Sequence, residues 1–195
     1  MKDRQFEAAE NLALIGRMLD QTRRRIVRNA GRPYLIWGYA TVLTTLAVGT
    51  AVALTSDTRW NWLWVLFFVV ASLLTHLFRL KPAEGEAHTF VDSVIGRIWL
   101  VTGATAILLT LLKLSGILAI PMAFVILLMM GMASTMTGLI VRLTPAVLGG
   151  TAGILLAPAM FLADPRCTGG LFIAAFVAMM IVPGHILNRR SKNAR

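Results

Sequence analysis

Apolar residues dominate the chain from Pro33 almost to its end, whereas the residues before Pro33 are largely charged. A helix needs roughly 20 predominantly apolar residues to cross a bilayer. Six stretches of suitable length follow one another: 33–54, 60–80, 94–113, 116–141, 145–163 and 168–188. The pattern predicts an all-α polytopic membrane protein with six transmembrane helices. Most connections are short, so we expect three helical hairpins, with a real loop only around 81–93.

The segment before these stretches has the pattern of an amphipathic helix over residues 3–29. Its apolar stripe, with spacings of three, four and seven residues, is Ala8, Leu12, Ile15, Leu19 and Ile26. Asn29 and Gly31 are typical helix terminators, so we expect this helix to end there and a new helix to begin at Pro33. The predicted domains are a cytoplasmic amphipathic helix (1–30), a six-helix transmembrane domain (31–190) and a tail (191–195).

Two roles are open for the N-terminal helix. Its basic end is suited to anionic lipid headgroups, and its apolar stripe is suited to a second copy of the chain or a cytoplasmic protein partner. The candidate contact residues are Leu12, Ile15, Leu19, Arg23, Arg24, Arg25, Arg28 and Arg32. The net charge of +10 does not indicate nucleic-acid binding, because the basic residues flank apolar spans.

Lys and Arg are distributed very unequally between the two sides of the predicted bundle. Sixteen of the 19 fall on the side of the N-terminal segment and the tail, and only Arg59, Lys113 and Arg166 fall on the other. The positive-inside rule therefore predicts that both termini are cytoplasmic. Aromatic belts are expected at both interfaces. The candidates are Tyr34, Trp37 and Tyr39 at the cytoplasmic side and Trp60, Trp62 and Trp64 opposite.

Small residues mark the expected helix contacts. Gly149, Gly153 and Ala157 recur every four residues, and Gly170, Ala174 and Ala178 do the same. Such spacing lets helix backbones approach closely in membranes. Pro158 is expected to kink the fifth span and Pro183 to loosen the sixth.

An internal repeat is also suggested by the sequence. Gly31 and Gly38 align with Gly96 and Gly103 around the starts of the first and third spans. Apolar helices with Arg at one end resemble one another in any case, so both a true repeat and a chance likeness remain open.

No catalytic, nucleotide-binding or metal-binding motif is present, and the spans contain no central acidic residue. With the single Cys167, a multi-cysteine metal site is excluded. His76 and His185 fit interfacial hydrogen-bonding residues or, with His88, a shared metal or proton site. We therefore predict a non-enzyme without cofactor or metal.

Three motifs resemble a known family. They are Asn29-Ala30-Gly31-x-x-Tyr34-Leu35-Ile36-Trp37-Gly38, Arg142-x-x-Pro145-x-x-x-Gly149-Gly150 and Pro183-Gly184-His185-x-Leu187. The family comprises small uncharacterised multi-spanning inner-membrane proteins of Bacteroidetes-type bacteria, from which the Arg-rich run at 23–25 departs. The resemblance implies an inner-membrane location and no activity. We expect a scaffold or regulatory membrane component, with a small oligomeric transporter or channel as the alternative.

Overall fold

The computed structural model describes residues 2–78 and 90–193, with side chains for Ala13, Leu14, Gly16, 31–78, 90–164 and 167–189. Every regular element in these ranges is a helix. The α-helices are α1 (Lys2–Thr55), α2 (Leu63–Leu77), α3 (Phe90–Leu114), α4 (Met122–Val141), α5 (Thr144–Leu156), α6 (Ala159–Leu162), α7 (Pro165–Phe176) and α8 (Val182–Asn193). A 3-10 helix, η1 (Thr58–Trp62), precedes α2, and a π-helix, η2 (Val177–Ile181), joins α7 to α8.

Six segments of the described chain are long and apolar enough to cross a membrane. They are Gly31–Thr55, Thr58–Leu77, Phe90–Leu114, Met122–Val141, Thr144–Leu162 and Cys167–Arg189. The predicted number of spans and the multi-pass membrane class are thereby confirmed. The fourth span starts at Met122 rather than at 116, because Gly116 adopts a φ of +79° and ends α3 in a left-handed cap.

The predicted end of the first helix at Asn29 and Gly31 is wrong. α1 is one helix of 54 residues that includes Pro33, so no helix end separates the predicted domains at residue 30. Gly31 acts as a contact point instead. A Cβ atom added to it would lie 3.0 Å from the backbone nitrogen of Asn188 and 3.2 Å from the carbonyl oxygen of Gly184. The absence of a side chain therefore lets α8 approach α1 closely.

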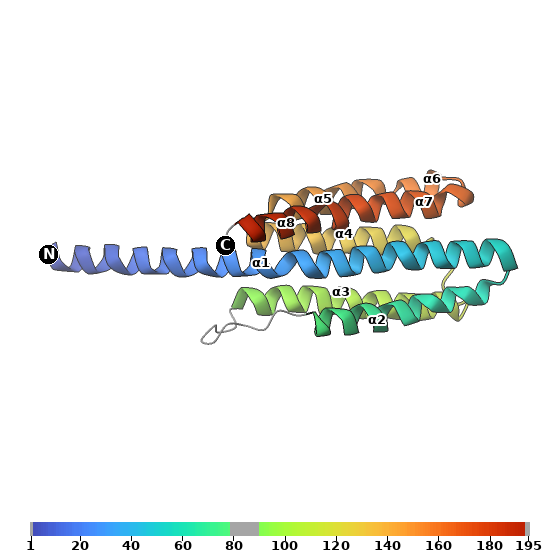
Figure 1. The fold of residues 1–195 in the computed structure, drawn as a ribbon, viewed down its shortest axis with the longest axis horizontal. Coiled ribbons are helices and arrows are strands. Elements are labelled where there is room, and N and C mark those ends of the chain that lie inside the picture. Colours follow the sequence, from blue (N-terminus) through green and yellow to red (C-terminus); the bar gives the residue numbers. More distant parts are fainter. Residues whose placement is uncertain (1, 79–89, 194–195) are drawn as a thin grey trace.

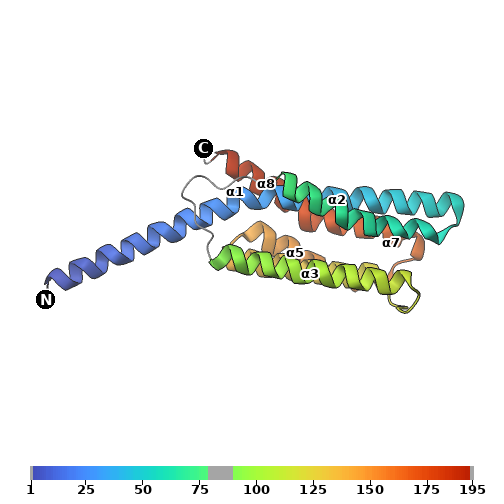
Figure 2. The same cartoon turned by 90° about the horizontal axis from the view of Figure 1, so that it is seen from below.

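The spans are arranged in two rows of three (Figures 1 and 2). One row contains α2, α1 and the α7–η2–α8 span, and the other contains α3, α4 and α5. The closest packing joins α4 to α5 and α1 to α8. Each of these pairs consists of helices from two different predicted hairpins. α1 extends beyond the bundle at the end where α8 finishes, and Figure 2 shows this extension inclined to the part of α1 within the bundle. The predicted loop around 81–93 lies largely outside the described residues.

Glycines allow the spans to pack tightly, both within and between the rows, at the α5 and α8 side of the bundle. A Cβ atom on Gly150 would lie 2.6 Å from the backbone nitrogen of Thr135, and one on Gly149 would lie 2.8 Å from the carbonyl oxygen of Met179. Gly38 has the same role between α1 and η2, where an added Cβ would lie 2.8 Å from a side-chain carbon of Ile181. These contacts leave no room for side chains, so this half of the bundle is dense.

Two prolines interrupt the helices of this dense half. α5 ends at Leu156, and Pro158 caps the short α6, as expected for a break in the fifth span. The carbonyl oxygen of Ile154 cannot receive a hydrogen bond from Pro158, and it accepts one from the backbone nitrogen of Ala157 at 3.3 Å instead. The π-helix η2 ends directly before Val182 and Pro183. The break at Pro158 therefore does not leave the carbonyl of Ile154 free for a ligand.

Candidate intramembrane binding cavity

A cavity of about 1300 Å³ lies in the other half of the bundle, between α1, α2, α3, α4 and the α7–η2 span. Small-molecule sites in proteins usually measure about 300–1,000 Å³. The cavity is therefore large enough for an extended molecule.

The inner face of α3 explains why side chains leave this space open. Gly96, Trp99, Gly103, Ala106 and Thr110 recur at spacings of three and four residues, so they lie on one helix face, and all of them line the cavity. A Cβ atom added to Gly96 or Gly103 would meet no atom within 4 Å. The neighbouring helices do not fill the gap that these small residues leave. Ala106 is the only buried residue among the described residues of α3.

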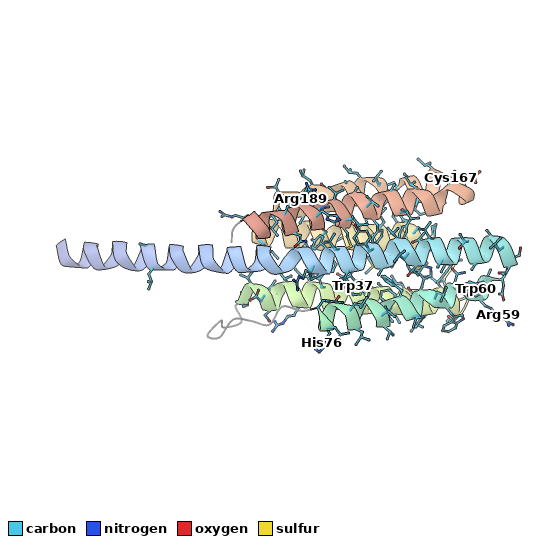
Figure 3. All side chains as sticks on the ribbon, viewed as in Figure 1. Trp37, Arg59, Trp60, His76, Cys167 and Arg189 are labelled. Atoms are coloured by element: carbon cyan, nitrogen blue, oxygen red, sulfur yellow. The ribbon has the colours of Figure 1, made fainter. Side chains whose placement is uncertain are left out.

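The cavity extends along the whole bundle. Its lining on α3 runs from Asp92 to Lys113, a rise of about 32 Å, which is close to the thickness of a bilayer core. Arg32 and His76 line the same end as Asp92, and Asn61 lines the end of Lys113. Figure 3 shows His76 near the end where α1 enters the bundle, together with Arg189, and Arg59, Trp60 and Cys167 at the other end.

Aromatic rings form much of the wall between these ends. Trp37 meets Phe67 edge to face with ring centroids 5.6 Å apart, and Trp64 meets the same Phe67 at 5.7 Å. Trp64 also contacts Phe172 of α7 at 6.2 Å. These contacts connect three spans through side chains that all line the cavity. They present apolar ring surface to its interior.

Most of the hydroxyl groups in the wall are already used as donors. Five lining threonines each donate to the carbonyl oxygen four residues earlier in their own helix. They are Thr41, Thr45, Thr75, Thr110 and Thr137, with distances of 2.7–2.8 Å. The indole nitrogen of Trp37 donates to the Thr75 oxygen at 3.0 Å. These groups can offer a ligand methyl groups and hydroxyl lone pairs, but no free donor.

A hydrogen-bonded pair fixes the inner wall to the dense half. The hydroxyl of Tyr34 lies 2.9 Å from the hydroxyl oxygen of Ser134 on α4. Ser134 donates its own proton to the carbonyl oxygen of Ala146 on α5, at 3.2 Å. Tyr34 must then be the donor to Ser134, because each hydroxyl has one proton. This short chain of hydrogen bonds holds α1, α4 and α5 together beside the cavity.

The sequence predictions for aromatic belts need correction. Trp60, Trp62 and Tyr39 are exposed, as expected for interfacial residues. Tyr34 and Trp37 instead point into the bundle, because both line the cavity and lie on the same helix face as Thr41. Trp64 also points inward, on the same helix face as Phe67. His185 pairs with Tyr39, with 2.8 Å between the tyrosine oxygen and Nε2. His76 lines the cavity and His185 does not, and His88 lies outside the described residues.

Of the two predicted small-residue stripes, the first is buried in helix contacts and the second is mostly exposed. Gly149, Gly153 and Ala157 are buried, and Gly149 and Gly153 contact η2 closely. Gly170 and Ala174 are exposed, and an added Cβ on Gly170 meets nothing within 4 Å. The second stripe therefore makes no close helix contact there within this chain. Ala178 is half-buried, and its carbonyl oxygen lies 3.1 Å from an added Cβ on Gly149.

The predicted lipid or partner contacts fall mostly outside the described side chains. This holds for Leu12, Ile15, Leu19, Arg23, Arg24, Arg25 and Arg28. Arg32 is described, and it is exposed at the mouth of the cavity.

Within the ranges that the structure describes, no group of three or more His, Cys, Asp or Glu side chains is placed to hold a metal ion. Comparisons with family models, curated proteins and solved structures found no match to this chain. The proposed function rests on the geometry of the cavity.

Proposed function

We propose that this protein binds an amphipathic, lipid-like molecule inside its transmembrane bundle and acts as a non-enzymatic regulatory or scaffold component of the bacterial inner membrane. The cavity between α1, α2, α3, α4 and α7 carries this proposal. Its middle is lined by aromatic rings, aliphatic side chains and hydroxyls, most of which already donate to groups of the protein. Ionisable side chains line its two ends. A chain with one polar head matches this distribution.

A pathway for ions fits this lining less well. Ion and proton pathways in membranes rely on charged or acidic side chains that face the interior of the bundle. The ionisable residues among the described cavity lining are Arg32, Tyr34, His76, Asp92 and Lys113. Four of them lie at the ends, and the hydroxyl of Tyr34 is bound to Ser134. The remaining wall favours an apolar occupant.

The location and orientation are part of the proposal. Sixteen of the 19 Lys and Arg residues belong to the side of the N-terminal segment and the tail, which supports a cytoplasmic position for both termini. The resemblance to inner-membrane proteins of Bacteroidetes-type bacteria supports the same membrane. The mouth lined by Arg32 and His76 then opens to the cytoplasmic leaflet.

α1 supplies the link between the cavity and the cytoplasm. It lines the cavity with Trp37 and Thr41, and it continues without a break through the basic run at 23–25 to Lys2. We propose that this run contacts anionic headgroups and that the Leu12 stripe contacts a cytoplasmic protein or a second copy of the chain. The extension of α1 away from the bundle in Figure 2 supports a protein contact for its distal part.

A transporter is the second candidate, because the cavity lining reaches both ends of the bundle. In this case the cargo would be the same amphipathic class of molecule. Transfer of a labelled single-chain amphiphile between the leaflets of proteoliposomes would distinguish transport from static binding.

The binding proposal is tested by filling the cavity. Gly103→Leu places a side chain in the open space of the cavity, whereas Gly49→Leu places the same side chain in open space on the exposed face of α1. We expect Gly103→Leu to lower the binding of a single-chain amphiphile at least about tenfold, or about 1.4 kcal/mol, and Gly49→Leu to leave it unchanged.

Tryptophan fluorescence provides the measurement. In a Trp60→Phe/Trp62→Phe background, the remaining tryptophans are Trp37, Trp64 and Trp99, which all line the cavity. A brominated dodecyl chain should quench them in a saturable manner. Absence of saturable quenching, or equal quenching in both leucine variants, would refute the proposed function.

A further inference from the structure

We infer that the cavity selects an amphiphile with an anionic headgroup, a phosphate monoester or a carboxylate, and that this headgroup is held at the mouth formed by Arg32 and His76. The inference rests on the proposed function and adds the class of headgroup and the orientation of the ligand.

The two ends of the cavity differ in their donors. At the first mouth, Arg32 offers a guanidinium group and His76 an imidazole, and the hydroxyl of Ser93 lies in the same lining. A guanidinium group binds phosphate and carboxylate through two parallel hydrogen bonds. At the opposite mouth the only described cation in the lining is Lys113, an ammonium group without this planar fork. It also stands in the last turn of α3, where a cation interacts favourably with the helix carbonyls.

The surroundings increase the positive potential at the first mouth. α1 continues as a helix from this mouth into the N-terminal segment, whose sequence is rich in arginine. The carboxylate of Asp92 opposes this charge, but it already has a partner within the chain. Arg32 and the arginine-rich sequence that precedes it favour an anion at this mouth.

The middle of the cavity selects against a headgroup at that depth. Thr41, Thr75 and Thr110 donate within their own helices, and the Trp37 indole donates to Thr75. A phosphate or carboxylate there would find no free donor among these groups, and the single hydroxyl of Ser72, one turn before His76, is too little to compensate a buried charge. The headgroup must therefore stay at a mouth, while the chain extends along Trp37 and Trp99 toward Trp64.

The test compares headgroups on one chain. The protein with Trp60→Phe/Trp62→Phe is titrated in neutral detergent with 12-bromododecyl phosphate, 12-bromododecanoate, 12-bromododecyl maltoside and 12-bromododecyltrimethylammonium. We expect the phosphate and the carboxylate to bind at least about tenfold more tightly than the neutral and cationic probes. Equal affinities for all four probes would overturn the headgroup assignment and leave the proposed function intact, whereas no saturable quenching by any probe would refute the proposed function itself.

Charge variants locate the headgroup. Arg32→Gln should remove the preference for the anionic probes. Arg97→Gln is the matched control, because Arg97 is an exposed arginine near the same end of the bundle that does not line the cavity. A loss of preference in Lys113→Gln but not in Arg32→Gln would reverse the orientation and overturn the inference. Excess inorganic phosphate should not displace the bromododecyl phosphate, and full displacement would indicate a site for a free anion instead.

Discussion

The contact between α4 and α5 gives the sharpest test of the dense half of the bundle. In Gly150→Ala the added methyl carbon would lie 2.6 Å from the backbone nitrogen of Thr135 and 2.7 Å from the carbonyl oxygen of Gly131. It would also clash with the Thr135 hydroxyl oxygen. Ordinary contact begins at 3.4 Å, and the atoms that are met include backbone, which cannot rotate away. α4 and α5 must therefore separate by about 0.8 Å, a gap that removes about a quarter to a half of the dispersion energy along the seam.

The energetic cost follows from two opposing terms. Overpacking of a close contact destabilises by roughly 1–3 kcal/mol, and the rigid backbone places this site near the upper value. Alanine recovers about 0.5–1 kcal/mol through its higher helix propensity. We expect Gly150→Ala to lower the free energy of unfolding by about 2 kcal/mol. Gly103→Ala has no atom within 4 Å of the new methyl group and should raise it by about 0.5–1 kcal/mol.

The assay is unfolding in mixed micelles with increasing sodium dodecyl sulfate, followed by circular dichroism. The same chemical change is made in two transmembrane helices, so effects of detergent and of composition cancel in the comparison. If Gly150→Ala were as stable as Gly103→Ala, the close approach of α4 and α5 would be wrong.

Two further predictions concern the hydrogen-bonded wall and the orientation. Ser134→Ala should destabilise the protein more than Tyr34→Phe in the same assay, because it leaves the buried Tyr34 donor without a partner. Tyr34→Phe leaves Ser134 bound to Ala146 and should lower the free energy of unfolding by only about 0.5–1 kcal/mol. The reverse order would contradict the assigned direction of donation. A reporter after Arg195 should be cytoplasmic and one inserted at Thr58 periplasmic, and a periplasmic C-terminus would contradict the proposed orientation.

The number of spans could be predicted because it depends on composition along the chain. The apolar length of each segment does not depend on how the helices pack against one another. Five of the six spans accordingly start within four residues of their predicted positions. The course of α1 could not be predicted in this way. Asn29 and Gly31 have the local preferences of a helix end, but Gly31 is needed where α8 crosses, and that neighbour is more than 150 residues away in sequence.

The cavity was not predictable from small residues alone. Gly31 and Gly38 align with Gly96 and Gly103 in the sequence, yet the first pair is packed against α8 and η2 and the second pair faces open space. A glycine on a membrane helix allows a neighbouring helix to approach closely, but whether a helix packs there depends on the arrangement of the whole bundle. The regular spacing of small and aromatic residues from Gly96 to Thr110 was the available signal.

The uninterrupted course of α1 has a mechanical consequence. The part from Lys2 to Gly31 is about 45 Å long at 1.5 Å per residue, and it is joined without a helix end to the inclined part of α1 that lines the cavity. A tilt of about 5° at the level of Arg32 would move the far end of such a lever by about 4 Å. A displacement of this size is enough to make or break contacts between side chains. A change in tilt too small to rearrange the membrane-embedded helices is in this way converted into a larger displacement at the N-terminal end of α1.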